Sequence, residues 1–129
     1  MVFAHDTEVA LVTAAALVNT AGRDRDTLAD VAALDAFFHT YGWTGRYEHT
    51  EAELREVQAL RPRLRQIWYA DEDGVAEIVN GLLREYRALP QLVKHDDEPY
   101  HVHATPFDAP LATRMAVEAA MAFADVVRA

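Results

Sequence analysis

The stretch VALVTAAALVNTA, residues 9–21, is the longest apolar stretch of the chain. It is shorter than the ~18 apolar residues that a membrane-spanning helix needs, so it predicts a buried helix and no membrane partner. Apolar residues occupy both sides of this helix, with Val9, Val12, Ala16 and Leu17 on one side and Leu11, Ala15 and Val18 on the other. A helix that is apolar all round is usually surrounded by other elements, so we expect it at the centre of the fold.

Capping residues mark the starts of the first three predicted helices. Asp6 is placed to cap the first helix, and Asp30 or Thr27 to cap a second. Thr50 followed by Glu53 forms the capping box of a third.

Apolar spacing predicts two more helices, and a proline interrupts the pattern of the third. We expect a kink or a break at Pro62. A fourth helix follows Gly74, with apolar residues at helical spacing as far as Tyr86. Asp108 is placed to cap a last, alanine-rich helix that extends to about Arg128.

Between the fourth and the last helix the helical periodicity stops. Residues 91–94 and 99–104 are short and extended in character, and an acidic segment joins them, which indicates a β-hairpin. The chain therefore predicts a mainly α fold, with about five helices around a central first helix and a short β-hairpin before the last. A chain of 129 residues is expected to form a single domain over residues 1–129.

Composition excludes several classes of function. The chain has no cysteine and no serine, so thiol and serine nucleophiles, iron–sulfur clusters and cysteine zinc sites are excluded. Its net charge of −9 repels a phosphate backbone, so we expect no nucleic-acid binding by this domain alone. No basic residue precedes an apolar run at the start of the chain, so we predict no secretory signal and a cytoplasmic protein.

Asn19 is the clearest local signal in the chain, because it ends an otherwise apolar helix. A buried amide needs hydrogen-bond partners, since an unpaired one costs ~1–3 kcal/mol. Either Asn19 binds the backbone of the following loop or it faces a pocket and orients a ligand.

His101 and His103 are two residues apart, so on a strand both side chains point to the same face. Such a pair can contribute to a metal site, to the polar part of a ligand pocket, or only to a half-exposed hairpin. A metal site requires a further ligand, and no spacing selects one among His95, Asp96, Asp97 and Asp108. We predict no metal site and no cofactor.

The basic residues suggest two different roles. Arg55, Arg61, Arg63 and Arg65 form a cluster that we interpret as a solvated face paired with local glutamates, although Arg61 and Arg65, one turn apart, could hold an anion. Arg114 lies among apolar residues of the last helix, so it either pairs with a buried carboxylate such as Glu118 or points into a pocket.

Two stretches of the chain resemble a known bacterial domain. The first consists of HDTEVAL, residues 5–11, followed by AALVNT, residues 15–20, and the second of HVHAT, residues 101–105, followed by DAPLATRMAVEAA, residues 108–120. Both are similar to the ABATE domain, the N-terminal half of CGNR zinc-finger proteins, which are described as stress-induced transcription regulators. In that family a four-cysteine zinc finger follows this domain. Because the present chain has no cysteine, we expect the DNA-binding finger to be absent from it.

The resemblance implies a ligand-sensing or regulatory domain. We expect it to bind a small-molecule effector in a pocket bounded by the first helix, the hairpin and the last helix, a usual design for a ligand site. The predicted ligand-binding residues are Asn19, His101, His103, Arg114 and Trp43, with Phe37 and Trp68 as weaker candidates for an apolar wall. We assign no catalytic residue. The alternatives are a small enzyme that uses histidine acid–base chemistry in the same pocket and a dimerisation scaffold, so a homodimer is possible.

Overall fold

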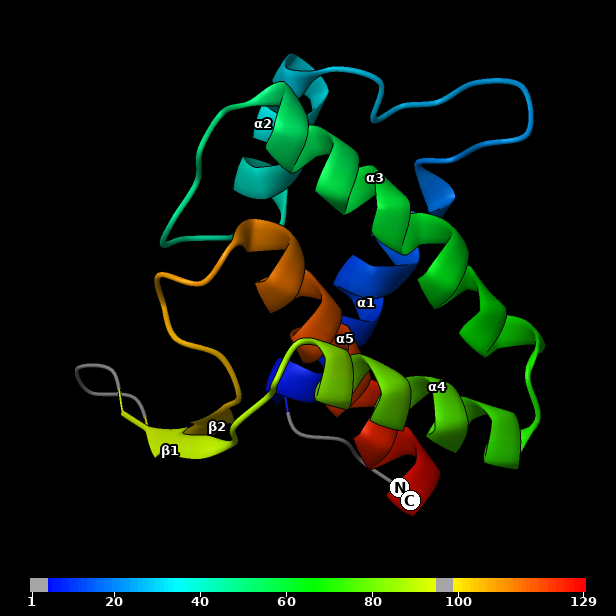
Figure 1. Ribbon diagram of the computed structural model, residues 1–129, viewed down its shortest axis with the longest axis vertical. Coiled ribbons are helices and arrows are strands. Elements are labelled where there is room, and N and C mark those ends of the chain that lie inside the picture. Colours follow the sequence, from blue (N-terminus) through cyan, green and yellow to red (C-terminus); the bar gives the residue numbers. More distant parts are fainter. Residues whose placement is uncertain (1–4, 95–98) are drawn as a thin grey trace.

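A computed structural model describes residues 5–94 and 99–129, and it is mainly helical. Its elements, in chain order, are α1 (His5–Asn19), α2 (Val31–Thr40), α3 (Glu51–Arg65), the 3-10 helix η1 (Gln66–Tyr69), α4 (Glu72–Glu85), β1 (Gln91–Val93), β2 (His101–His103) and α5 (Leu111–Arg128) (Figure 1). The predicted fold class, helical with a short hairpin before the last helix, is confirmed. Among the described residues, no helix combines the length and the apolarity needed to cross a membrane.

The centre of the fold is α5 and not α1, so this part of the prediction was wrong. Helix α5 packs against α1, α3 and α4, and ten of its residues are buried. On α1, by contrast, Val9 is 45% exposed and Val12 is 61% exposed. The alanines of α5 allow three helices to approach it closely, and this leaves one apolar side of α1 facing solvent.

Helix α3 runs through Pro62 without the predicted break. A proline removes the N–H that would bond to the carbonyl four residues earlier, here that of Gln58. In this helix Arg61 Nε donates to the Gln58 carbonyl at 3.3 Å, so a side chain replaces the missing backbone donor. The α-helix ends at Arg65 and continues as η1.

The predicted caps were right for the middle helices and wrong at the last one. Asp30 accepts from the Ala33 N–H at 2.8 Å, and Thr50 accepts from the Glu53 N–H at 3.2 Å. Helix α5 begins after Pro110 without a side-chain cap, so Asp108 does not serve as its cap. Asp6 lies within the first turn of α1 and not before it.

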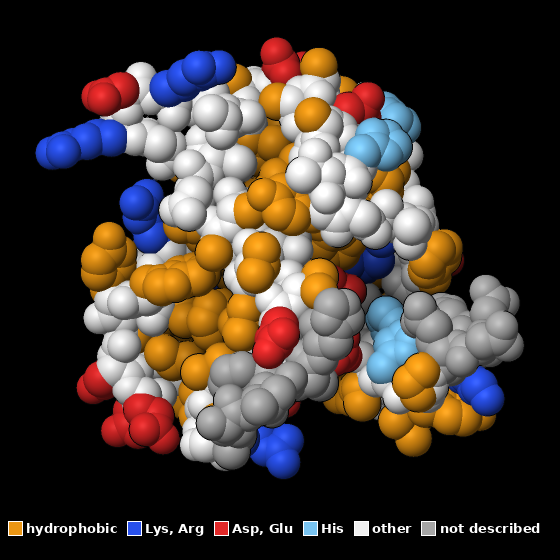
Figure 2. Space-filling model, turned by 180° about the vertical axis from the view of Figure 1, so that it is seen from behind, with side chains coloured by type: hydrophobic (Ala, Val, Ile, Leu, Met, Phe, Trp, Pro, Cys, Tyr) orange, Lys and Arg blue, Asp and Glu red, His pale blue; other side chains and the backbone are white. Residues whose placement is uncertain are grey.

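Strands β1 and β2 pair in antiparallel register, with Leu92 opposite Val102 and Val93 opposite His101. The hairpin projects from the helices at the lower left of Figure 1. Its outward face is apolar, since Leu92 is 71% exposed and Val102 is 46% exposed, and hydrophobic side chains gather on the hairpin at the lower right of Figure 2. The acidic segment 95–98 lies outside the described residues.

Candidate functional site

The loop between α1 and α2 is fastened to α3 by a buried arginine. Arg61, 8% exposed, donates from Nη1 to Asp26 Oδ1 at 2.7 Å and from Nη2 to Asp26 Oδ2 at 2.9 Å. Arg61 Nη1 also donates to the Thr20 hydroxyl at 3.1 Å. Hydrogen bonding from Arg61 lowers the pKa of Asp26 from 3.8 to about 2. One guanidinium therefore holds this loop at its first residue, Thr20, and again at Asp26.

Two further contacts secure the same loop. The Leu28 N–H donates to Asp26 Oδ1 at 2.8 Å, and Gln58 Nε2 donates to the Leu28 carbonyl at 2.8 Å. The Leu28 side chain is fully buried in the core. The loop thus forms a fixed wall beside α1.

Next to this wall, α1 and α2 form a groove without any charged side chain in its lining. It contains about 860 Å³ of empty space, part of it open to solvent. Its lining consists of Val12, Ala15, Ala16, Asn19, Thr20, Thr27, Phe37 and Tyr41. The loop fastened by Arg61 contributes Thr27, α2 contributes Phe37, and Tyr41 follows directly after α2. The groove therefore combines an apolar floor of small side chains with amide and hydroxyl groups, the usual composition of a ligand site.

Asn19 lies exposed at the C-terminal end of α1, at the edge of this groove. Within the described part of the chain, its side-chain amide makes no hydrogen bond, so the alternative in which it binds the loop backbone is not met. Thr20 makes the local bond instead, because its hydroxyl donates to the Leu17 carbonyl at 2.6 Å. The Asn19 amide thus keeps its donors and its acceptor for solvent or a ligand.

Arg114 is buried and serves the loop between α2 and α3. Its Nη1 donates to the Thr44 carbonyl at 2.5 Å, its Nη2 to the Arg46 carbonyl, and its Nε to the Ala109 carbonyl at 3.0 Å. Glu118 acts on Arg114 only through a longer-range attraction and not as an ion pair. The sequence suggested that Arg114 either pairs with a buried carboxylate or points into a pocket. It does neither, because its donors bind backbone carbonyls.

The loop that Arg114 holds is anchored to α2 as well. The Tyr47 hydroxyl donates to Asp35 Oδ1 at 2.5 Å, and the Tyr47 ring stacks on Phe38 with ring centroids 4.3 Å apart. Burial and this hydrogen bond raise the pKa of Tyr47, while the same bond lowers the pKa of Asp35. The phenol therefore remains protonated and acts as a structural donor.

Trp43, on this loop, lines a small cavity that is separate from the groove. The Arg114 guanidinium lies 6.0 Å from the centre of the indole ring. The cavity lies between α1, α3 and α5 and is partly open, and its lining also includes Thr13 and Glu118. Burial raises the pKa of Glu118, and Arg114 opposes this increase. The space available to the centre of a water molecule is about 10 Å³, too small for an organic ligand.

His101 and His103 contact each other on the hairpin, as the two-residue spacing predicted. Their Nε2 atoms are 2.8 Å apart, and His101 Nδ1 lies 3.2 Å from the Pro99 carbonyl oxygen. Neither residue lines the groove or the small cavity. Among the described residues there is no group of three or more potential metal ligands. Of the four residues considered above as further metal ligands, His95, Asp96 and Asp97 lie outside the described residues.

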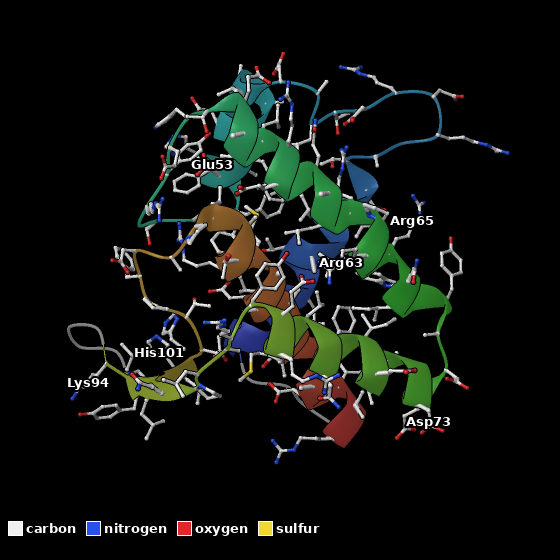
Figure 3. All side chains as sticks on the ribbon, viewed as in Figure 1. Glu53, Arg63, Arg65, Asp73, Lys94 and His101 are labelled. Carbon is white, nitrogen blue, oxygen red and sulfur yellow. The ribbon has the colours of Figure 1, made fainter. Side chains whose placement is uncertain are left out.

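The five predicted ligand-binding residues are not brought together. Trp43 and Arg114 are neighbours, and so are His101 and His103, but Asn19 is separate from both pairs. In Figure 1 the hairpin lies at the lower left, while α1 runs into its following loop at the upper right, and Figure 3 labels His101 on that distant hairpin. Neither of the two hollows described lies between the first helix, the hairpin and the last helix, because the groove lies between α1 and α2 and the small cavity between α1, α3 and α5. Of the weaker candidates, Phe37 lines this groove, whereas Trp68 is 47% exposed and packs against Phe123.

The roles of Asp26 and Arg61 were not predicted from the sequence. Arg61 was expected on a solvated face, whereas the structure buries it. Arg63 does lie at the surface, but its partner at 2.6 Å is Glu85 of α4 and not one of the local glutamates that the sequence suggested. The signal that could have found Arg61 is helical spacing. Arg61 lies four residues after Val57 and three before Leu64, on the face of α3 that enters the core.

Comparison with known proteins identifies one family. Residues 11–129 match ABATE, which is described as "Putative stress-induced transcription regulator". No curated protein matches the chain.

Proposed function

Because the chain belongs to the ABATE family, we propose that it is the regulatory domain of a transcription regulator and binds a small effector molecule in the α1–α2 groove. The groove itself is the observation that supports this proposal. The space that the centre of a water molecule can occupy in it, about 550 Å³, falls within the usual range for small-molecule sites, roughly 300–1,000 Å³, and much of it is open to solvent.

The lining of the groove indicates the chemical class of the effector. No lining residue carries a charge, so an ionic ligand would lose hydration without gaining a partner. Val12, Ala16 and Phe37 suit an apolar body, and the Asn19 amide can both donate to and accept from a polar group on it. We therefore expect an uncharged effector with an apolar body and a carbonyl, amide or hydroxyl group.

The loop held by Arg61 provides a route by which an effector acts on the rest of the domain. Thr27 of this loop lines the groove, and Asp26 beside it holds Arg61 of α3. An effector changes the conformation of a regulator only if it binds one conformation better than another. Contact with Thr27 would favour the conformation in which the loop is fastened to α3.

Other parts of the chain have less support as the functional site. Neither His101 nor His103 lines the groove or the small cavity, so acid–base catalysis by these histidines has no support from either of these two hollows. DNA binding by this domain is opposed by its net charge of −9. The regulatory proposal therefore leaves DNA contact to another part of the regulator.

A ligand screen with matched variants tests the proposal. Uncharged aromatic amides and lactones are compared with aromatic acids and amines of the same size by their effect on thermal unfolding. At 100 times its dissociation constant, a bound compound stabilises the domain by ~2.7 kcal/mol. We expect stabilisation by members of the uncharged set, and we expect Ala15→Phe, which fills the groove, and Asn19→Ala to reduce it.

Ala36→Phe is the matched control, because Ala36 is an exposed residue of α2 outside the groove. Stabilisation that persists in Ala15→Phe would place the ligand elsewhere and contradict the proposal. The proposal would also be contradicted if no compound of the screen bound and Ala15→Phe changed the oligomeric state, since the groove would then be an interface between two copies.

A further inference from the structure

The indole nitrogen of Trp43 has no hydrogen-bond partner although it is buried. It is the only buried polar side-chain atom of the described residues in this condition. An unpaired N–H in the interior loses its bond to water without replacement, which is unfavourable. The position of this N–H therefore needs an explanation, and the adjoining cavity supplies one.

The cavity beside Trp43 has the size and the polarity of a site for one water molecule. A water requires roughly 10–15 Å³ of space for its centre and two to four polar partners, and the cavity offers about 10 Å³. Apart from Trp43, its polar side chains are Thr13 and Glu118, and the rest of the lining is apolar.

The hydrogen-bonding capacities of the three polar groups match those of a water molecule. Trp43 Nε1 is only a donor. The Thr13 hydroxyl donates its hydrogen to the Val9 carbonyl at 2.8 Å, so toward the cavity it can only accept. Glu118 forms no hydrogen bond within the described residues. Its carboxylate oxygens, like the Thr13 hydroxyl oxygen, are acceptors. A water can accept one bond from Trp43 and donate two, one each to Thr13 and Glu118.

We infer that the cavity between α1, α3 and α5 holds an internal water molecule that bridges Trp43 Nε1, Glu118 and Thr13. This water links the α2–α3 loop to α1 and α5. Arg114 supports the arrangement, since it holds the backbone on both sides of Gly45 and lies over the Trp43 ring. The charged groups that act on Glu118 are Arg114 on its own helix and Asp6 on α1.

The first test detects the water at the indole N–H. The chain has two tryptophans, so Trp68→Phe leaves Trp43 as the source of the single indole resonance. Nuclear Overhauser transfer between that N–H and water, compared in the laboratory and rotating frames, distinguishes a long-lived bound water from hydrogen exchange. We expect a bound-water signal in Trp68→Phe, and a high-resolution crystal structure should show the water within hydrogen-bond distance of Trp43 Nε1.

Variants of Glu118 then test the bridge. Glu118→Gln keeps an acceptor and should retain the bound-water signal, whereas Glu118→Leu removes the acceptor, fills space and should abolish it. In the Trp68→Phe background, Trp43 fluorescence should also change with pH as Glu118 ionises, and Glu118→Gln should remove that change. If Glu118→Leu fails to fold, Glu118→Gln and the crystal structure still decide the question. An empty cavity, or an indole N–H bonded to a protein atom, would overturn the inference.

Discussion

The loop between α1 and α2 and the loop between α2 and α3 are each held by one buried arginine, but the two arginines bind different chemical groups. The loop between α1 and α2 is held by Arg61, whose guanidinium forms two hydrogen bonds to the Asp26 carboxylate. The loop between α2 and α3 is held by Arg114, whose guanidinium binds two carbonyls of that loop, those of Thr44 and Arg46, and also the Ala109 carbonyl before α5. Only the first contact is an ion pair.

This difference shows what each loop depends on. The Asp26 carboxylate titrates, so the first loop responds to acid, whereas carbonyls do not titrate. The carbonyls bind Arg114 only if the backbone of residues 44–46 keeps its path, so the second loop responds to backbone geometry. The first loop borders the proposed effector groove, and the second carries Trp43.

Removing Arg114 is expected to have the largest effect. Arg114→Met leaves three carbonyls without their donor and should lower the free energy of unfolding by about 2–4 kcal/mol. Arg63→Met is the matched control, because Arg63 is an exposed member of a surface pair and its loss should cost less than ~1 kcal/mol. Urea unfolding measures both values, and equal losses would refute the role assigned to Arg114.

Asp26→Asn breaks the ionic contact of the first loop and should cost about 1–2 kcal/mol near neutral pH, a value reduced by the exposure of the Asp26 side chain. Since Arg61 lowers the pKa of Asp26 from 3.8 to about 2, the carboxylate stabilises the folded state fully above its unfolded pKa. This contribution is lost as the pH falls toward about 2. Unfolding measured across this range should show wild type and Asp26→Asn converging in acid, while wild type and Arg114→Met stay apart. A constant difference for Asp26→Asn would contradict the ionic account.

Alanine substitutions at two glycines of the second loop distinguish the cost of backbone strain from the cost of a clash with Arg114. Gly42 and Gly45 both have positive φ, at 72° and 80°. An alanine at position 42 would meet no atom within 4 Å, so Gly42→Ala should cost only the conformational strain, about 1 kcal/mol. At position 45 the new Cβ would lie 2.8 Å from the Phe107 carbonyl oxygen and 3.1 Å from Arg114 Nη1. Thermal unfolding should therefore show a clearly larger loss for Gly45→Ala, and equal losses would mean that the loop yields without disturbing Arg114.

The smallest effect is expected at the surface of the second loop. Arg46 and Glu48 form an ion pair at 2.6 Å with side chains 46% and 43% exposed. Exposed pairs contribute little, so Glu48→Gln should change the free energy of unfolding by less than ~0.5 kcal/mol. A loss above ~1 kcal/mol in urea unfolding would show that this pair, and not Arg114 alone, holds the loop.

The sequence predicted the candidate site only in part, and the reason differs from residue to residue. Asn19 was found because a polar residue that ends an apolar helix is visible locally, and the structure places it at the edge of the groove. The contact between His101 and His103 followed from strand alternation. Their expected convergence with Asn19 did not occur, because no local pattern reports the distance between a hairpin and the end of a helix.

The sequence by itself determined the helices, the caps of α2 and α3 and the hairpin, because these depend on residues within one or two turns of each other. Only the tertiary structure decided which helix is central, which arginines are buried and where the groove lies. The partners that decide these matters are far apart in the chain, as are Asp26 and Arg61, 35 positions apart, and Thr44 and Arg114, 70 positions apart. Burial depends on how complete elements pack, so a side chain such as Arg61 acquires its role only when the helices come together.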